Sequence, residues 1–155
     1  MSRYDPIVRN DFMNTLVSPI YGTTGYVTVD TIHSHKLSVF FITMACGVLY
    51  DSHPSASTLA QQYHALSRAA LSVDSIVHEA NCATVQALFM IIRFIYISDP
   101  RGEERWLLGG LCVKVAQVVC RQQHLLNLPL TFLNIVLRLD FVGTNPGVAF
   151  QILLT

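Results

Sequence analysis

The chain has 155 residues, which is enough for one domain with a hydrophobic core and too few for two. Its ten Lys and Arg residues balance its ten Asp and Glu residues, so it lacks the excess positive charge with which proteins bind nucleic acid. Hydrophobic residues make up 52% and charged residues only 13%, against about a quarter charged in a typical globular protein. We therefore expect helices buried on more than one face, a place in a larger assembly, or a membrane protein.

A membrane span needs about 20 mostly apolar residues, and no apolar run here reaches that length cleanly. The longest runs cover residues 37–50, 87–97 and 125–139, and Arg93 interrupts the second. The first ten residues are polar and resemble no signal peptide. A membrane-associated protein therefore stays an alternative and is not the favoured interpretation.

The chain begins with a lead-in that prolines and glycines interrupt. Within residues 1–34 the apolar spacing predicts one short helix, Ile7–Val17, and the stretch Tyr26–Ile32 reads as an extended loop.

Two amphipathic helices are predicted next. Ser34 is a candidate N-cap for a helix over His35–Leu49, and a second helix runs from Ser55 or Ser57 to Val73. Their apolar residues recur at helical spacing, which predicts buried stripes. The predicted stripes are Leu37, Phe41, Met44, Ala45 and Val48, with Phe40 beside them, in the first helix, and Leu59, Tyr63, Leu66, Ala70 and Val73 in the second.

A third helix, Cys82–Ser98, follows a capping Asn81 and is apolar on nearly every side, so we expect it at the centre. Its one charged residue, Arg93, should pair with an acid or reach solvent at a helix crossing. The candidate acids are Asp74, Glu79 and Glu104, and the alternative is an Arg on an exposed stripe. The aromatic residues Phe89, Phe94 and Tyr96 are expected in the core.

A fourth helix is predicted over Glu103–Val119, and its two faces differ in residue size. One face is large and apolar, and the other is small, which lets another helix approach closely. The members are Leu107, Leu108, Leu111, Val115 and Val118 on the first face and Gly109, Cys112 and Ala116 on the second. Short loops between successive helices favour antiparallel neighbours. The predicted fold is all-α, built from antiparallel helical hairpins.

No residue of the chain is predicted to be catalytic, to bind a cofactor or to bind a metal. His33 and His35 form half of a metal-ligand pattern, but no cysteine or carboxylate pair is near in sequence, so capping or surface roles are expected. The other histidines, His53, His64, His78 and His124, are scattered and expected on the surface. The four cysteines have no C-x-x-C spacing and read as buried reduced thiols of an intracellular protein. Neither a G-x-S-x-G sequence nor a Gly-rich phosphate loop is present, so we expect no enzyme.

Five short stretches in one order resemble the fungal-specific transcription factor domain, also called the middle homology region or xylanolytic-activator-type regulatory domain. The resemblance covers about Tyr4–Val119. The stretches are His33–Leu37, Tyr63–Ser72, Val85–Leu88, Glu104–Leu111 and Lys114–Gln117.

The resemblance implies an all-α regulatory domain of a nuclear transcription factor, without catalytic residues. In that family the domain follows an N-terminal zinc-cluster module, which this sequence lacks, because such a module needs more closely paired cysteines. DNA contact and zinc would belong to that module. The remaining partners would be other proteins or a second copy of the chain. A small membrane-associated or helical interaction protein is the alternative.

The resemblance ends in mid-helix after Val119. We therefore divide the chain into a partial, truncated regulatory domain, residues 1–119, and an unmatched tail, residues 120–155. Because GTATGT encodes Val-Cys and is a common start of fungal introns, we hypothesise that the tail is a translated intron or a shifted reading frame; the alternative is a diverged C-terminus. Sequencing the mature transcript tests this. Without the later helices of the family, the chain should expose apolar surface and bind hydrophobic dyes or aggregate.

Overall fold

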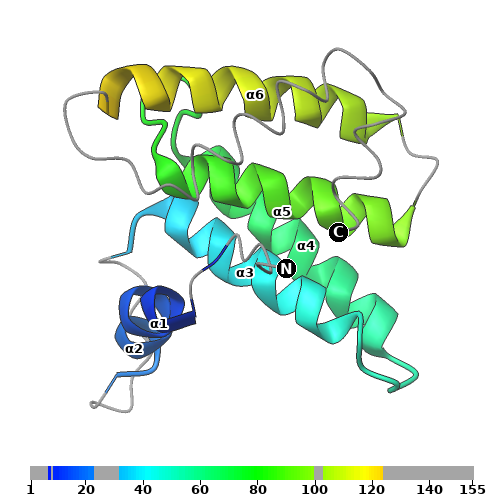
Figure 1. Ribbon diagram of the computed structural model, residues 1–155. Coiled ribbons are helices and arrows are strands. Elements are labelled where there is room, and N and C mark those ends of the chain that lie inside the picture. The colour runs from blue at the N-terminus through cyan, green and yellow to red at the C-terminus, as the bar shows by residue number, and fades with distance from the viewer. Residues whose placement is uncertain (1–6, 8, 23–31, 100–102, 124–155) are drawn as a thin grey trace, which may run out of the picture.

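A computed structural model describes residues 7, 9–22, 32–99 and 103–123 (Figure 1). Within these ranges every regular element is a helix and no strand occurs, which confirms the all-α prediction. The elements are α1 (Arg9–Phe12), the π-helical turn η1 (Met13–Val17), α2 (Ser18–Ile20), α3 (Ser34–Val48), α4 (Ala56–Val73), α5 (Cys82–Ser98) and α6 (Glu104–Gln123).

The helices α3 and α4 form an antiparallel hairpin, as their cross-contacts show. Ser34 near the start of α3 bonds to Asp74 just after α4, and Ser38 bonds to Ser67 one turn further along. Phe41 then stacks on Tyr63, with ring centroids 6.5 Å apart. Residue numbers rise along α3 as they fall along α4, so the two helices run in opposite directions, as the short connection between them predicts.

The buried face of α4 consists mainly of small residues, and the predicted stripe is wrong at three of its five members, whereas Ala70 is buried and Tyr63 is half-buried. Its buried residues are Ala56, Ala60, Ser67, Ala70 and Leu71. Leu59, Leu66 and Val73 are exposed, Val73 to 74%. Small side chains let α3 come close, and the two buried serines then bond across the contact: Ser38 Oγ donates to the Ser67 carbonyl at 2.9 Å, and Ser67 Oγ donates to the Ser38 carbonyl at 3.0 Å.

The start of α3 also differs from the prediction. Its N-cap is His33, whose ring nitrogen Nδ1 accepts a hydrogen bond from the His35 backbone N–H at 3.2 Å, and Ser34 is already helical. Of the predicted stripe only Ala45 and the flanking Phe40 are fully buried, and the other members are half-buried. The other buried residues of α3 are His35, Ser38, Val39 and Ile42, and they belong to a face shifted by about one residue from the predicted stripe. His35 and Ser38 are polar, so the spacing of apolar residues could not identify this face.

The helix α5 is central, as predicted, and lies between α3 and α6 (Figure 1). Its bounds and its Asn81 cap agree with the prediction: the Asn81 side chain accepts from the Thr84 N–H while the Thr84 hydroxyl accepts from the Asn81 N–H. Eleven of its residues are buried, including Phe89 and Phe94, and Tyr96 is half-buried.

Arg93, the one charged residue of α5, lies exposed, as in the alternative of an Arg on an exposed stripe, and it forms no ion pair with the three described candidate acids. Its three candidate acids have other partners: Glu104 pairs with Arg68, and Asp74 and Glu79 lie beside His33. A helix that is apolar on nearly all sides still has one solvent-facing edge, and Arg93 occupies it.

The helix α6 packs its small-residue face on α5, as predicted. Cys112 and Ala116 are fully buried together with Val115 and Val119, and the Cys112 Sγ lies 3.9 Å from the Val85 carbonyl oxygen. Gly109 adds nothing to this close approach, because a Cβ there would meet no atom within 4 Å.

Most of the large-residue face of α6 lies outward. Leu107, Leu111 and Val118 are exposed, Leu107 to 78%. Val115, assigned to that face from its spacing, is buried instead.

The helix α6 continues past the position where the family resemblance ends. It runs to Gln123, and Cys120 packs against the core from a half-buried position. Residues 124–155 lie outside the described part of the chain, so the division at 119 stays a prediction.

The N-terminal helical segment is longer than predicted, reaching Ile20 through a π-helical turn. Leu16 and Ile20 are buried, and the Phe12 ring stacks on Phe40 at 6.2 Å. Nearly all of the predicted loop Tyr26–Ile32 lies outside the described residues.

Candidate functional site

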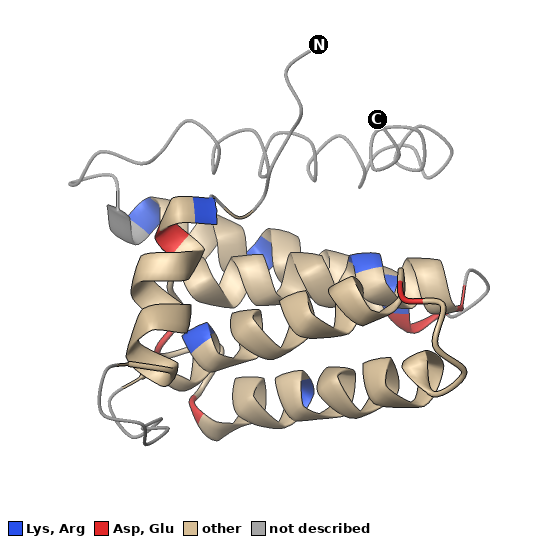
Figure 2. Cartoon of the chain, turned by 90° about the horizontal axis from the view of Figure 1, so that it is seen from below, with Lys and Arg blue, Asp and Glu red and all other residues tan. Residues whose placement is uncertain are grey.

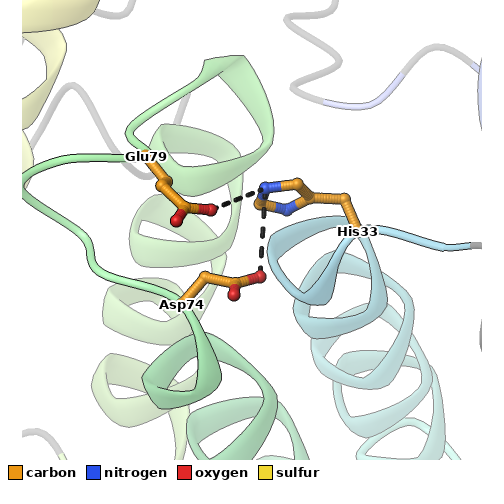
Figure 3. Close-up of side chains that lie close together, drawn as sticks. All are labelled: His33, Asp74 and Glu79. Carbon is orange, nitrogen blue, oxygen red and sulfur yellow. Dashed lines mark ion pairs between the residues drawn. The ribbon is translucent and has the colours of Figure 1, made fainter.

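Three side chains of residue types that can bind a metal ion, His33, Asp74 and Glu79, lie close together at one end of the α3–α4 hairpin (Figure 3). His33 is the N-cap of α3, Asp74 is the C-cap of α4, and Glu79 lies in the connection that leads to α5. Each residue occupies an element end, where the chain changes direction and side chains of different segments meet. We call these three residues the His33 cluster.

The atoms of the His33 cluster lie close together but not within hydrogen-bond distance of one another. His33 Nε2 lies 3.7 Å from Glu79 Oε2 and 3.9 Å from Asp74 Oδ2, and all three atoms lie within 4.8 Å of one another. Hydrogen bonds span about 2.7–3.2 Å, so neither contact is one. The side chains of His33, Asp74 and Glu79 are 35%, 32% and 56% exposed, so the cluster is open to solvent on the Glu79 side.

The neighbouring residues fix the His33 ring. Its Nδ1 accepts from the His35 N–H, and its edge packs on the His35 ring at a centroid distance of 4.8 Å. An accepting Nδ1 carries no proton, so the neutral ring has its proton on Nε2, which points at the two carboxylates.

Asp74 is oriented from two sides. The Ser34 hydroxyl donates to Asp74 Oδ2, and this hydrogen bond is the largest cause of a lowered pKa of the Asp74 carboxyl. The Asp74 backbone carbonyl lies 3.3 Å from His35 Nε2. Asp74 is therefore ionised at neutral pH and held in place by the first turn of α3.

His35 is not part of the His33 cluster, but its hydrogen bonds connect the residues beside the cluster. It is fully buried, and its Nδ1 lies 2.8 Å from the Thr84 hydroxyl of the α5 cap. With Nε2 donating to the Asp74 carbonyl, Nδ1 accepts from Thr84, and Thr84 in turn accepts from the Asn81 N–H. This chain of hydrogen bonds joins the ends of α3, α4 and α5 beneath the His33 cluster.

The His33 cluster bears on the sequence analysis in two ways. The capping role expected of a histidine here is confirmed for His33, whereas His35 is buried and not on the surface. No carboxylate pair is near His33 along the sequence, but the fold of the α3–α4 hairpin brings Asp74 and Glu79 close to it in space. The expected absence of a metal-binding residue stays a prediction.

The remaining histidines do not add to the cluster. His53 and His78 are exposed, and His124 lies outside the described residues. His64 is half-buried and stacks on Phe94 at 4.6 Å, and its Nε2 is buried without a hydrogen-bond partner. Burial lowers the pKa of His64, the nearby Arg68 lowers it further, and Glu104 acts against both.

The cysteines are free thiols in the described ranges, but of the burial expected for all four only that of Cys112 is confirmed, since the other three are half-buried. Burial raises the pKa of Cys46 to about 11 and that of Cys112 to about 12, so neither is an activated nucleophile.

Among the described helices, none has the length and hydropathy that crossing a bilayer requires. No protein-family model, no curated protein and no solved structure matches the chain.

Proposed function

We propose that the chain is a regulatory, non-DNA-contacting domain of a nuclear transcription factor of the fungal zinc-cluster kind, and that it acts through protein contacts and not through catalysis. The observation that supports this proposal is that the helices carrying the stretches with the family resemblance pack on one another. The stretches were chosen from the sequence for their likeness and order alone.

One contact joins two of the stretches, and two further contacts join a stretch to a residue beside another stretch. Arg68, inside the stretch 63–72, forms an ion pair with Glu104, the first residue of the stretch 104–111. Cys112, between the stretches of α6, contacts Val85, the first residue of the stretch 85–88. His35 of the first stretch bonds to Thr84, immediately before Val85.

The charge distribution agrees with a domain that leaves DNA to another module. The formal net charge is zero, and the Lys and Arg residues of the described helices are spread over several helices without gathering on one face (Figure 2). In this proposal DNA binding and zinc belong to a zinc-cluster module elsewhere in the protein, and localisation is nuclear.

A second candidate is a helical interaction protein without a role in transcription. The outward apolar face of α6, with Leu107, Leu111 and Val118, favours it, because large exposed apolar side chains at helical spacing are typical of surfaces that bind another helix. Both candidates act by binding protein, and they differ in what the binding controls.

A reporter experiment separates the two candidates. Residues 1–155 are inserted between a DNA-binding domain and an activation domain in a fungal cell, and reporter transcription is compared with that of a direct fusion. A regulatory domain changes reporter output, and the change disappears in a matched insert whose α3–α4 contact is disrupted by Ser67→Leu. Equal output from the intact insert, the disrupted insert and the direct fusion, at equal protein levels, contradicts the regulatory role.

A further inference from the structure

We propose that the His33 cluster binds a divalent transition metal ion of the Zn²⁺ class, which fastens the start of α3 to the connection between α4 and α5. This site is separate from the proposed regulatory function and does not depend on it. The ligands are His33 Nε2, one oxygen of Asp74 and one oxygen of Glu79, and water completes the coordination on the exposed Glu79 side.

The donor set selects the metal class. One imidazole nitrogen and two carboxylate oxygens suit Zn²⁺ and its neighbours, whereas Mg²⁺ and Ca²⁺ prefer oxygen ligands alone. Three protein ligands with solvent in the remaining positions form an open site.

The distances leave room for an ion. With metal–ligand bonds of about 2.0–2.1 Å, two ligands of a tetrahedral site lie about 3.3–3.4 Å apart. The His33–Glu79 and His33–Asp74 separations of 3.7 and 3.9 Å exceed that value by little. The three ligand atoms lie within 4.8 Å of one another, so closing the site requires these partly exposed side chains to move inward.

Electrostatics favours a cation at this position. The carboxylates of Asp74 and Glu79 both face His33 Nε2. A neutral His33 offers a single N–H group at this position and no positive charge. In the described part of the chain neither carboxylate forms an ion pair with a Lys or Arg. An ion between the carboxylates replaces their mutual repulsion with two attractive contacts.

Neighbouring groups orient the ligands before the metal arrives. The Ser34 hydroxyl donates to Asp74 Oδ2, the same oxygen that faces His33 Nε2, as neighbouring groups do for metal ligands in proteins. The His33 ring packs on the His35 ring.

Binding has one structural consequence. A neutral histidine that binds metal through Nε2 carries its proton on Nδ1, where His33 now accepts the cap bond from His35. The proton therefore moves from Nε2 to Nδ1 within the ring, no net proton is released, and the cap bond breaks. The loss of that helix-cap bond weakens binding and predicts moderate affinity.

Titration calorimetry of the full chain with ZnCl₂, after removal of metal with a chelator, tests the proposal. We expect one Zn²⁺ per chain and a rise in melting temperature that the chelator reverses. Glu79→Gln, at an exposed position where folding is unaffected, should weaken binding at least tenfold, and Ser34→Ala by about tenfold or more. The matched control is His78→Gln, which removes an exposed histidine next to Glu79 and should bind Zn²⁺ like the unaltered chain.

Nitrogen-detected NMR of the His33 ring gives an independent measurement. The proton should lie on Nε2 without metal and on Nδ1 with Zn²⁺, and the His35 amide should lose its protection from exchange. The proposal is overturned if Zn²⁺ does not bind, if Glu79→Gln binds it equally well, or if the His33 tautomer stays the same at saturating Zn²⁺. It is also overturned if His78→Gln abolishes binding.

Discussion

Exchanging the residue types at two adjacent positions of α4 tests which face of this helix is buried. Leu66 is 47% exposed, and Ser67 is fully buried against α3. In one variant Leu66 is replaced by Ser, and in the other Ser67 is replaced by Leu. The structure predicts that the second, apparently hydrophobic, substitution destabilises the fold more than the first.

The magnitudes follow from the contacts. Complete burial of a Leu side chain contributes about 1.5–3 kcal/mol, so Leu66→Ser at a half-exposed site costs about 1 kcal/mol. Ser67→Leu removes the hydrogen bond from Ser67 Oγ to the Ser38 carbonyl, which contributes about 1 kcal/mol. It also forces three more carbon atoms into a close helix contact, which costs about 1–3 kcal/mol. The sum for Ser67→Leu is about 2–4 kcal/mol.

Urea unfolding followed by circular dichroism, at low micromolar protein concentration to limit aggregation, measures both free energies. If the apolar stripe read from the sequence were the buried face, the order would be reversed: Leu66→Ser would cost about 2–5 kcal/mol and Ser67→Leu almost nothing. A larger loss for Leu66→Ser than for Ser67→Leu therefore refutes the α3–α4 packing described above.

Three further predictions concern single residues. Gly110→Ala should raise the free energy of unfolding by about 1 kcal/mol, because Gly110 is inside α6 and a Cβ there meets no atom within 4 Å; an unchanged or lower urea midpoint contradicts this. Cys112 should resist iodoacetamide at pH 8 until the chain unfolds, since burial raises its pKa to about 12, and peptide mass spectrometry measures its labelling. His64 has a folded pKa below the ordinary 6.5, so the unfolded chain takes up the proton first; the stability it contributes is complete above pH 6.5 and is lost as the pH falls through 6.5 towards the folded pKa. The urea concentration at the unfolding midpoint should therefore decrease as the pH is lowered from 7.5 to 5.5, and His64→Phe should make this decrease smaller. An equal decrease of the midpoint with pH in both proteins contradicts the assignment of this effect to His64.

The parts of the fold that depend on local sequence were predictable. The bounds of α5 follow from Asn81, whose side chain and Thr84 form a capping box, and from an apolar run that ends at Ser98. The all-α class follows from helical periodicity and short connections. Both signals lie within a few residues of the structure that they predict.

The sequence predicts the buried face of a helix correctly only where its large apolar residues and its small residues lie on the same side. In α5 nearly every face is apolar, so any choice is close to correct. In α4 the apolar stripe and the small-residue face point in different directions, and the contact with α3 selects the small residues. Periodicity weights each position by hydrophobicity, whereas packing also depends on how closely two backbones approach, and that depends on the partner helix.

The His33 cluster shows the same limit for a site. The capping role of His33 is a local property and was within reach of the sequence. Its two carboxylates come from the end of α4 and the following connection, and they approach His33 only after the α3–α4 hairpin forms. The hairpin was predicted, but its register was not, and a shift of one helical turn would separate Asp74 from Ser34 and His33.

The helices α4 and α6 share an arrangement that bears on the proposed function. Each buries small residues and leaves large apolar ones outside: Leu66 and Val73 on α4, and Leu107 and Val118 on α6. A helix that ended its folding at this core would gain more by turning the large residues inward, because buried area contributes in proportion to its size. The exposed large side chains give α4 and α6 outward apolar surface, which the proposed binding to another protein uses.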